Sequence, residues 1–523
     1  MVIKALMLLV FFGTMVGIGL YCRQQATDVN GFVLGGRSVG PWLTAFAYGT
    51  SYFSAVVFVG YAGQFGWKYA IAATWAGIGN ALLGSLLAWV VLGRRTRIMT
   101  QHLDSATMPE FFGKRFGSTS LKIAASIIIF IFLIPYTASL YNGLSRLFGM
   151  AFDIDYTVCV IVMAVLTGIY VIAGGYMATA INDFIQGIIM LFGICAVIAA
   201  VLHSQGGFLA ALESLSKISN ETASGPVAGA PGVFASFFGP DPVNLLGVVI
   251  LTSLGTWGLP QMVQKFYAIK SEKSIDTGTV ISTLFAVVVA GGCYFLGGFG
   301  RLFSDVVGVT ESGTPVGGFD AVIPAMLSGL PDLLLAVVVI LVLSASMSTL
   351  SSLVLTSSST LTLDLLKGHV IKDMDEKRQV FVMRCLIVVF ILISVVLAII
   401  QYKSSVTFIA QLMGISWGAL AGAFLAPFLY GLYWKKATKA ACWASFLFST
   451  VVMVTNIFVR ASFPALLQSP INAGAFCMLA GLVIVPVVSL FTRKPDQDLV
   501  EDAFSCYDRK VLVSQKEALG DAE

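Results

Sequence analysis

Long apolar stretches recur along this chain and decide what it can fold into. Thirteen segments, each at least twenty residues long, are mostly apolar and are separated by more polar connections. Hydrophobic runs of 18 or more residues are typical of helices that cross a bilayer. In lipid, only helices and closed barrels satisfy the backbone, and these runs are too long for barrel strands. The sequence therefore predicts an all-α polytopic membrane protein with 13 transmembrane helices.

The composition agrees with this class. Of the 523 residues, 57% are hydrophobic and 11% are charged, and the net charge of +4 is spread over the connections. This distribution suggests no nucleic-acid partner, and eight scattered cysteines without a CxxC pair predict no metal cluster or disulfide framework. The predicted spans are 3–22, 42–66, 68–92, 121–149, 155–178, 182–203, 243–265, 277–303, 333–361, 376–402, 406–432, 437–459 and 471–491.

Basic residues mark alternate connections. Lysines and arginines gather at 23–37, 94–115, 265–273 (Lys265 included), 367–378, 435–439 and 493–494, whereas the intervening connections carry at most an isolated cation. Cytoplasmic loops of membrane proteins carry the excess of Lys and Arg. The pattern therefore predicts an N-terminus outside and a C-terminus in the cytoplasm, which agrees with an odd number of spans.

The span 333–361 is crowded with hydroxyl groups that a lipid-facing helix does not need. Ala345, Ser348, Thr349 and Ser352 follow the spacing i, i+3, i+4 and i+7, so they share one helical face. Such a face can supply oxygen ligands to a cation in mid-membrane. It can equally serve close helix packing, or hydroxyls that bond back to their own helix.

Two other spans are interrupted by residues that weaken a helix. The centre of 42–66 reads Gly-Thr-Ser-Tyr-Phe-Ser, and 243–265 contains Gly-Thr-Trp-Gly-Leu-Pro. Backbone carbonyls freed by such breaks are tolerated in lipid beside a cavity or an ion. The two spans lie five apart and run in opposite directions, as paired broken helices do at transporter binding sites. Because the first break and the hydroxyl face lie at similar depth, the sequence predicts an all-oxygen cage, which suits a hard cation.

Charge helps to choose the ion. No Asp, Glu or His occupies the middle of a predicted span, although proton-coupled carriers usually need one there. Neutral oxygens therefore favour Na⁺ over H⁺. No buried cation is evident to pair with a solute carboxylate, and the N-terminus of a broken helix is the alternative partner. Asp183, near a span end, is either a helix cap or part of an ion-release path.

Three motifs resemble the sodium:solute symporter family, and especially its sodium/proline members. They are Leu34-Gly35-Gly36-Arg37-Ser38-Val39-Gly40-Pro41, Met347-Ser348-Thr349-Leu350-Ser351, and Gly174-Gly175 followed by Asn182-Asp183-x-x-Gln186. The resemblance covers nearly the whole chain. It implies a single transporter domain, 1–523, with a five-plus-five inverted repeat, one extra helix before it and two after. The parts would be a peripheral helix 3–22, repeats 42–203 and 243–432, two peripheral helices in 437–491, and a cytoplasmic tail 492–523.

The resemblance also implies roles for individual residues. Sodium would be held by the carbonyls of Thr50, Phe53 and Ala345 and the hydroxyls of Ser348 and Thr349. Tyr136 and Trp257 would lie beside the substrate, together with Tyr52, Ser54 and Pro260 at the two breaks, and Asp183 would lie on the inward sodium path. Each aromatic has the alternative of core packing.

Departures from the family pattern bear on the solute. Sodium/proline members carry an aspartate where this chain has Tyr52, and the Gly258-Leu259-Pro260 segment resembles the pantothenate branch. The prediction is a Na⁺-coupled importer of a small organic solute, first an amino acid such as proline, with pantothenate or another small carboxylate as the alternative. A passive channel or a transporter-like sensor is a different class. No enzyme activity, cofactor beyond the coupling ion, or obligate protein partner is predicted, and a bacterial plasma membrane is the expected location.

Overall fold

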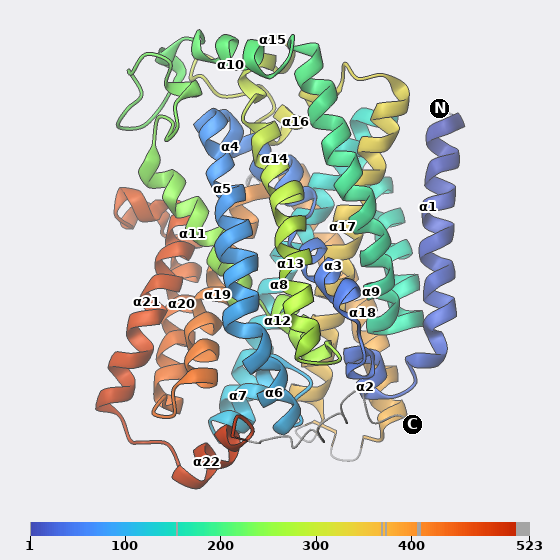
Figure 1. Ribbon diagram of the computed structural model, residues 1–523, viewed down its shortest axis with the longest axis vertical. Helices are drawn as coiled ribbons and strands as arrows, with labels where there is room; N and C mark the ends of the chain where they lie inside the picture. Colours follow the sequence, from blue (N-terminus) through green and yellow to red (C-terminus); the bar gives the residue numbers. More distant parts are fainter. Residues whose placement is uncertain (1, 153–154, 368–369, 372–373, 405–408, 509–523) are drawn as a thin grey trace, which may run out of the picture.

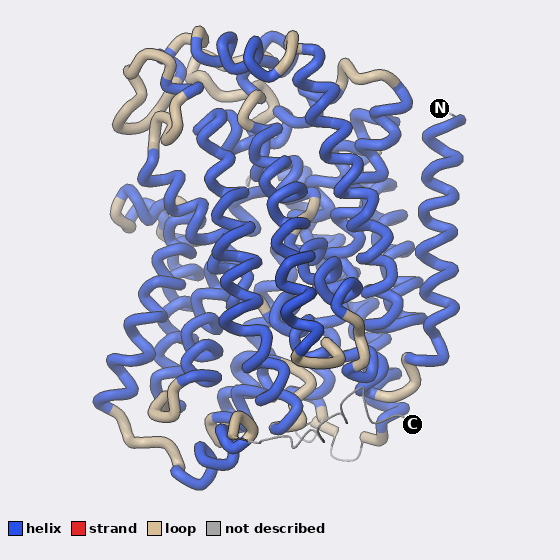
Figure 2. Tube along the Cα trace, in the orientation of Figure 1, coloured by secondary structure: helices blue, strands red, loops and turns tan. Residues whose placement is uncertain are grey.

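The computed structural model describes residues 2–152, 155–367, 370–371, 374–404 and 409–508. Most of these residues are helical, and the long helices stand side by side along one axis (Figures 1 and 2). The principal helices are α1 (Val2–Tyr21), α3 (Pro41–Tyr52), α4 (Ala62–Tyr69), α5 (Thr74–Gly79), α8 (Thr119–Phe152), α9 (Tyr156–Ser204), α11 (Pro242–Gly258), α12 (Pro260–Ala268), α13 (Lys273–Ala286), α14 (Gly292–Gly297), α17 (Asp332–Thr360), α18 (Glu376–Ser404), α19 (Ile409–Tyr433), α20 (Lys439–Phe458) and α21 (Pro470–Phe491).

Short helices close the two ends of the bundle. At the lower end of Figure 1 lie α2 (Val29–Leu34), α6 (Arg94–His102), α7 (Met108–Arg115) and α22 (Gln497–Ser505). At the upper end lie α10 (Phe208–Ser216), α15 (Ser304–Val307) and α16 (Val322–Leu327). The start of α1 and the helix α22 therefore lie at opposite ends of the bundle.

Ten helical runs in the described part of the chain are long and apolar enough to cross a membrane, or eleven if the bent pair α11–α12 counts as one span. Two of these runs are twice the usual length: 47 residues from Val56 to His102 and 49 residues in α9. A straight helix of that length extends about 70 Å, far beyond a bilayer core of about 30 Å. Each run contains a residue with positive φ, Ala70 (50°) and Gly175 (54°), where a straight helix cannot continue.

The chain doubles back within α9. Thr167 contacts Met347 of α17, and Gly193 packs against Leu341 of the same helix. In a straight helix Thr167 and Gly193 would be about 39 Å apart, whereas Leu341 and Met347 are only about 9 Å apart along α17. The left-handed glycine Gly175, against which Phe32 packs, is the turning point.

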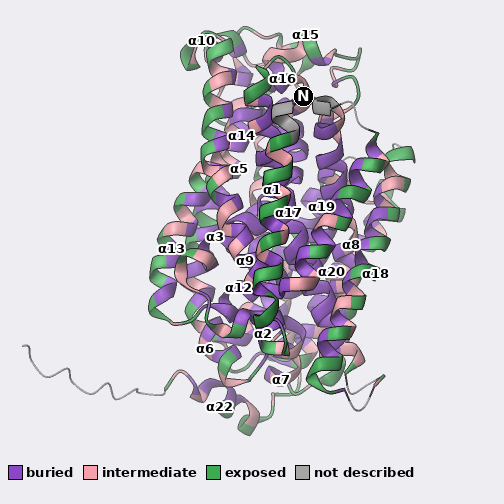
Figure 3. Cartoon of the chain, turned by 90° about the vertical axis from the view of Figure 1, so that its right-hand side faces the viewer, coloured by how far each residue is buried: buried purple, intermediate pink, exposed green. Residues whose placement is uncertain are grey.

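The helices α17 and α19 form the centre of the bundle. In their most apolar windows, 83% and 94% of residues are buried, against 22% for α1. Figure 3 shows the same gradient, with buried residues inside and exposed residues on the outer surface. Exposed Leu9, Phe192 and Phe491 are apolar, as expected for side chains that face lipid.

Both predicted helix breaks are confirmed. Helix α3 ends at Tyr52, Phe53 is extended, and the chain resumes as wide π-helical turns from Val56 to Tyr61. Helix α11 ends at Gly258, Leu259 is extended, and α12 leaves at an angle of 45°. A Cβ atom on Gly258 would lie 2.8 Å from the backbone of α19, so glycine here permits close packing at the second break.

The Gly-Gly-Arg motif before α3 anchors the two broken elements to each other. Gly35 and Gly36 have positive φ values of 58° and 67°, which glycine adopts without strain. The Arg37 guanidinium then donates to the carbonyls of Tyr267 at 3.1 Å and Ser105 at 2.7 Å. Since Tyr267 belongs to α12, the start of α3 and the end of α12 are joined at the lower end of the bundle.

Candidate functional site

The break after α3 lies against the hydroxyl face of α17 in the interior of the bundle. The last carbonyls of a helix have no helical amide partners, and at the end of α3 these are the carbonyls around Thr50 and Phe53. Thr50, Phe53, Ala345, Ser348 and Thr349 are all fully buried. The freed carbonyls therefore meet the hydroxyls of α17 in a place that is closed to solvent.

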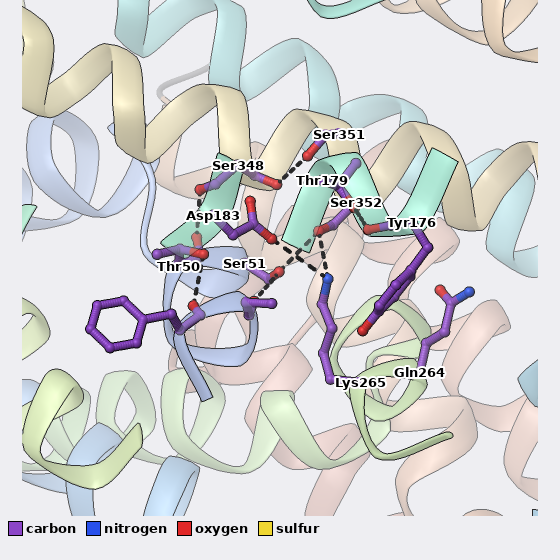
Figure 4. Close-up of polar contacts among 12 residues, drawn as sticks. Thr50, Ser51, Tyr176, Thr179, Asp183, Gln264, Lys265, Ser348, Ser351 and Ser352 are labelled. Carbon is purple, nitrogen blue, oxygen red and sulfur yellow. Dashed lines mark hydrogen bonds and ion pairs between the residues drawn. The ribbon is translucent and has the colours of Figure 1, made fainter. Parts of the chain in front are cut away.

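Hydrogen bonds draw these five residues into one cluster, which we call the oxygen cage. Ser348 Oγ donates to the Thr50 carbonyl at 3.0 Å, and Thr349 Oγ1 lies 3.2 Å from the same oxygen and 3.3 Å from the Phe53 carbonyl. Both hydroxyls also lie 3.1 Å from the Ala345 carbonyl. Figure 4 shows the contact between Ser348 and Thr50. The structure thus brings together all five oxygens of the predicted sodium set.

The oxygen cage carries no formal charge. Three carbonyl dipoles point into it, and the two hydroxyls can turn their lone pairs inward once they no longer donate to the carbonyls. Such an all-oxygen set fits a hard cation. Its neutrality fits a monovalent ion better than a divalent one, because the full charge of the ion must be balanced by dipoles in a dry interior.

Tyr136 of α8 lies in a group of buried aromatic residues. Its ring meets Trp417 of α19 edge-on, with centroids 5.9 Å apart, and Tyr61 from the wide turns after the first break is a near neighbour. The hydroxyls of Tyr61 and Tyr136 and the indole nitrogen of Trp417 are buried, without a hydrogen-bond partner among the described residues. Buried polar atoms are normally bonded, so these three atoms are available to a polar solute.

Of the other predicted substrate residues, Ser54 lies beside the Tyr136 hydroxyl, whereas Trp257 and Pro260 are not gathered with it. Trp257 donates its indole hydrogen to the Leu83 carbonyl at 2.9 Å, Pro260 begins α12, and Ser54 Oγ accepts from the Val56 amide at 3.2 Å. The side chain of Tyr52 lies outside the described residues. Trp417 connects the surroundings of Tyr136 with the end of α11, since Gly255 of α11 packs against its ring. Sequence reasoning missed Trp417, which read as an ordinary core aromatic of the span 406–432.

A buried ion pair lies beside Ser352 of α17, which is one helical turn beyond Ser348 of the oxygen cage. Lys265 Nζ is 3.9 Å from Asp183 Oδ2, and the two side chains are 3% and 1% exposed. The prediction that Lys265 is a cytoplasmic loop cation is wrong, and so is the expectation that no cation is buried. Asp183 lies eight residues after the turn at Gly175, inside the second arm of α9, so it is not a helix cap.

The second helix break is the sequence signal that could have indicated that Lys265 lies inside the bundle. The predicted span ended at Lys265, but α12 continues to Ala268 after its 45° bend and carries the lysine into the interior. Lys270 and Lys273 remain in the connection that follows α12 or at the start of α13, so the alternation of basic connections is unchanged.

The fold is shared with a solved transporter. A structure of a Na⁺-coupled sialic acid symporter, in a substrate-bound outward-open state, superposes with a TM-score of 0.73 over 95% of this chain and 99% of that one, at 15% sequence identity. At this identity the likeness shows the shared fold alone.

Sequence comparison gives the family. The model of the sodium:solute symporter family matches residues 32–448, so this chain belongs to that family. It is 26% identical to the osmoregulated proline transporter OpuE of Bacillus subtilis (strain 168), over 93% of this chain and 94% of the relative. It is 28% identical to a sodium/proline symporter of Staphylococcus aureus, over 94% and 93%. The family predicted from the three motifs is confirmed, and the chain is an integral membrane protein.

Proposed function

We propose that this chain imports a small organic solute together with Na⁺, and that an amino acid such as proline is the first candidate. One observation carries the sodium part: two buried hydroxyls of α17 lie within hydrogen-bond distance of three buried carbonyls, two from the break at the end of α3 and one from α17. The names of the relatives, a proline transporter and a sodium/proline symporter, support the solute.

The proposed architecture has 13 spans, with a five-plus-five inverted repeat preceded by one helix and followed by two. The turns at Ala70 and Gly175 support this count, since each divides a double-length run. The matching breaks at Phe53 and Leu259 support the repeat. The N-terminus would be outside and the C-terminus cytoplasmic, in a bacterial plasma membrane.

In the proposed cycle, Na⁺ enters the oxygen cage and ties the end of α3 to α17. The solute then binds between the two broken helices, with Tyr136, Trp417 and Tyr61 offering their free polar atoms. Both ligands favour the same arrangement of the helices, so each must raise the affinity of the other by the same factor. Release toward the cytoplasm would pass Asp183.

The solute has to be small, and its carboxylate needs a partner. The N-terminus of α12, which begins at Pro260 directly after the extended Leu259, supplies a positive helix end inside the protein. Proline fits because its ring is apolar and its carboxylate is compact. Pantothenate is the second candidate, favoured by the Gly258-Leu259-Pro260 segment and by Tyr52.

Uptake by the purified protein in proteoliposomes tests the proposal. Labelled proline and labelled pantothenate are offered with inward gradients of Na⁺, Li⁺, K⁺ or H⁺. We expect saturable, Na⁺-dependent accumulation of proline, which also separates a carrier from a passive channel. Equal uptake in sodium-free buffer would refute sodium coupling. Accumulation of pantothenate without accumulation of proline would make pantothenate, rather than proline, the proposed solute.

A further inference from the structure

Lys265 brings a positive charge into the interior that the proposed transport cycle has not used. Its Nζ donates to Ser352 Oγ at 3.0 Å and lies 5.1 Å from the centre of the Tyr176 ring, in addition to its ion pair with Asp183. Figure 4 shows the amine pointing between Asp183 and Ser352. The ammonium is therefore held by α9 and α17, although it is attached to α12.

Two hydroxyls connect this ammonium to the oxygen cage. Ser352 Oγ lies 2.9 Å from Ser51 Oγ, and Ser51 directly follows Thr50, whose carbonyl belongs to the cage. Ser352 is also four residues after Ser348 on α17, so the two side chains are stacked about 5–6 Å apart. The ammonium and a cation in the cage would thus be separated by roughly 10 Å of water-poor protein, where charges interact appreciably.

Asp183 balances the charge of Lys265. Neither carboxylate oxygen receives a hydrogen bond from a described residue, so the ion pair is the main compensation for its burial. The other titratable groups that face the pair within the described part of the chain are the phenols of Tyr170 and Tyr176. Among the described residues, the net charge beside the oxygen cage is therefore set by Lys265 and Asp183.

We propose that Lys265 is a tethered cation that, with Asp183, sets the affinity of the oxygen cage for Na⁺. The ammonium repels an ion in the cage and the carboxylate attracts it, so the pair holds sodium affinity at an intermediate value. Because Lys265 belongs to α12, which begins at the second break, a movement of that segment changes the repulsion. This inference rests on the proposed sodium coupling.

The test is a sodium titration of the purified full-length protein, with tryptophan fluorescence as the readout and choline added to keep the ionic strength constant. The parent is compared with Lys265→Met, with Asp183→Asn, with the double variant and with one control variant. Lys265→Met leaves the carboxylate unbalanced, and we expect sodium affinity to rise about tenfold. Asp183→Asn leaves the ammonium unbalanced, and we expect affinity to fall about tenfold. The double variant removes both charges and should return to within about threefold of the parent.

A second ion pair, in which the carboxylate is buried and the lysine is partly exposed, supplies the control. Lys122 lies 3.7 Å from the fully buried Asp364, which is 15 residues beyond Thr349 and thus about 22 Å farther along the same helical run. Lys122→Met should leave sodium affinity unchanged. Thermal unfolding of each variant shows whether it is folded.

The outcomes separate this inference from the proposed function. A parent protein that does not respond to Na⁺ refutes the sodium coupling itself. If the parent responds but Lys265→Met leaves its sodium affinity unchanged or lowers it, or Asp183→Asn raises it, the tethered cation is refuted while sodium coupling stands. A structural role of the pair alone would lower stability without moving sodium affinity in opposite directions.

Discussion

Two buried polar regions contact the same face of α17, and their polar groups are compensated in different ways. The oxygen cage contains no charged group, and its hydroxyls and carbonyls satisfy each other at 3.0–3.3 Å. The pair of Lys265 and Asp183 carries two full charges that are balanced across 3.9 Å. The cage can therefore stand without a ligand, whereas either member of the pair alone would leave an unbalanced charge in the interior.

The comparison assigns different tasks to the two regions. A neutral cage gains or loses a cation without leaving a charge behind, which suits an ion that must be released in every cycle. A permanent ion pair cannot exchange its members, so it suits a fixed electrostatic background. Between them, Ser51 and Ser352 provide a hydrogen-bonded link through which the two regions share α3 and α17.

The largest expected effect separates the cage from the rest of the hydroxyl face. The double variant Ser348→Ala with Thr349→Ala loses two of the five oxygens of the cage, and the cage has no charged group that could compensate for them. We expect sodium affinity to fall at least about 100-fold, since each lost ligand to a charged group costs about 1.5–3 kcal/mol. Sodium-dependent uptake into proteoliposomes measures it.

Ser357→Ala is the matched control for that double variant. Ser357 is buried on α17, eight residues beyond Thr349, and its hydroxyl has no partner among the described residues. Its removal should leave sodium dependence intact. A similar loss in the control and the double variant would mean that the whole hydroxyl face, rather than the cage, binds the ion.

The next largest effect is on the thermal stability of variants in the pair of Lys265 and Asp183. Removing one partner of a buried ion pair costs about 3–5 kcal/mol, because the remaining charge is left unpaired. Lys265→Met and Asp183→Asn should each lower the unfolding temperature in sodium-free detergent solution. The variant with both changes should be more stable than either. Ser348→Ala with Thr349→Ala should lower that temperature too, because the buried carbonyls of Thr50 and Phe53 lose these donors, but it alone should also abolish the rise on addition of Na⁺. If the singles and the double were equally stable, the two charges would not be coupled.

The cage could be predicted from the sequence because its signals are local. The spacing of Ala345, Ser348, Thr349 and Ser352 defines a face of one straight helix, and the interrupted centre of 42–66 marks a break at similar depth. The pair could not be predicted, because the position of Lys265 depends on how α12 leaves the break. A lysine at the end of a straight span lies at the membrane surface, but after a 45° bend it lies inside.

The solute region shows the same limit. Tyr136 was predicted as a polar-tipped aromatic within a span, and it lies near Tyr61 and Trp417. Trp417 carried no sequence signal, since nothing in 406–432 distinguishes it from a packing residue. It becomes notable only when three helices bring unpartnered polar atoms together.

The smallest expected effect tests the link between the two regions. Ser352→Ala removes the hydroxyl that contacts both Lys265 Nζ and Ser51 Oγ. We expect sodium affinity to fall about threefold, the effect of one neutral hydrogen bond, because Ser51 no longer steadies the backbone at Thr50. An unchanged affinity would mean that the cage and the pair are independent. The same substitution in the Lys265→Met background sharpens the result. A similar decrease there would show that the hydroxyl acts on the cage through Ser51, whereas a smaller decrease would show that it acts by holding the ammonium in place.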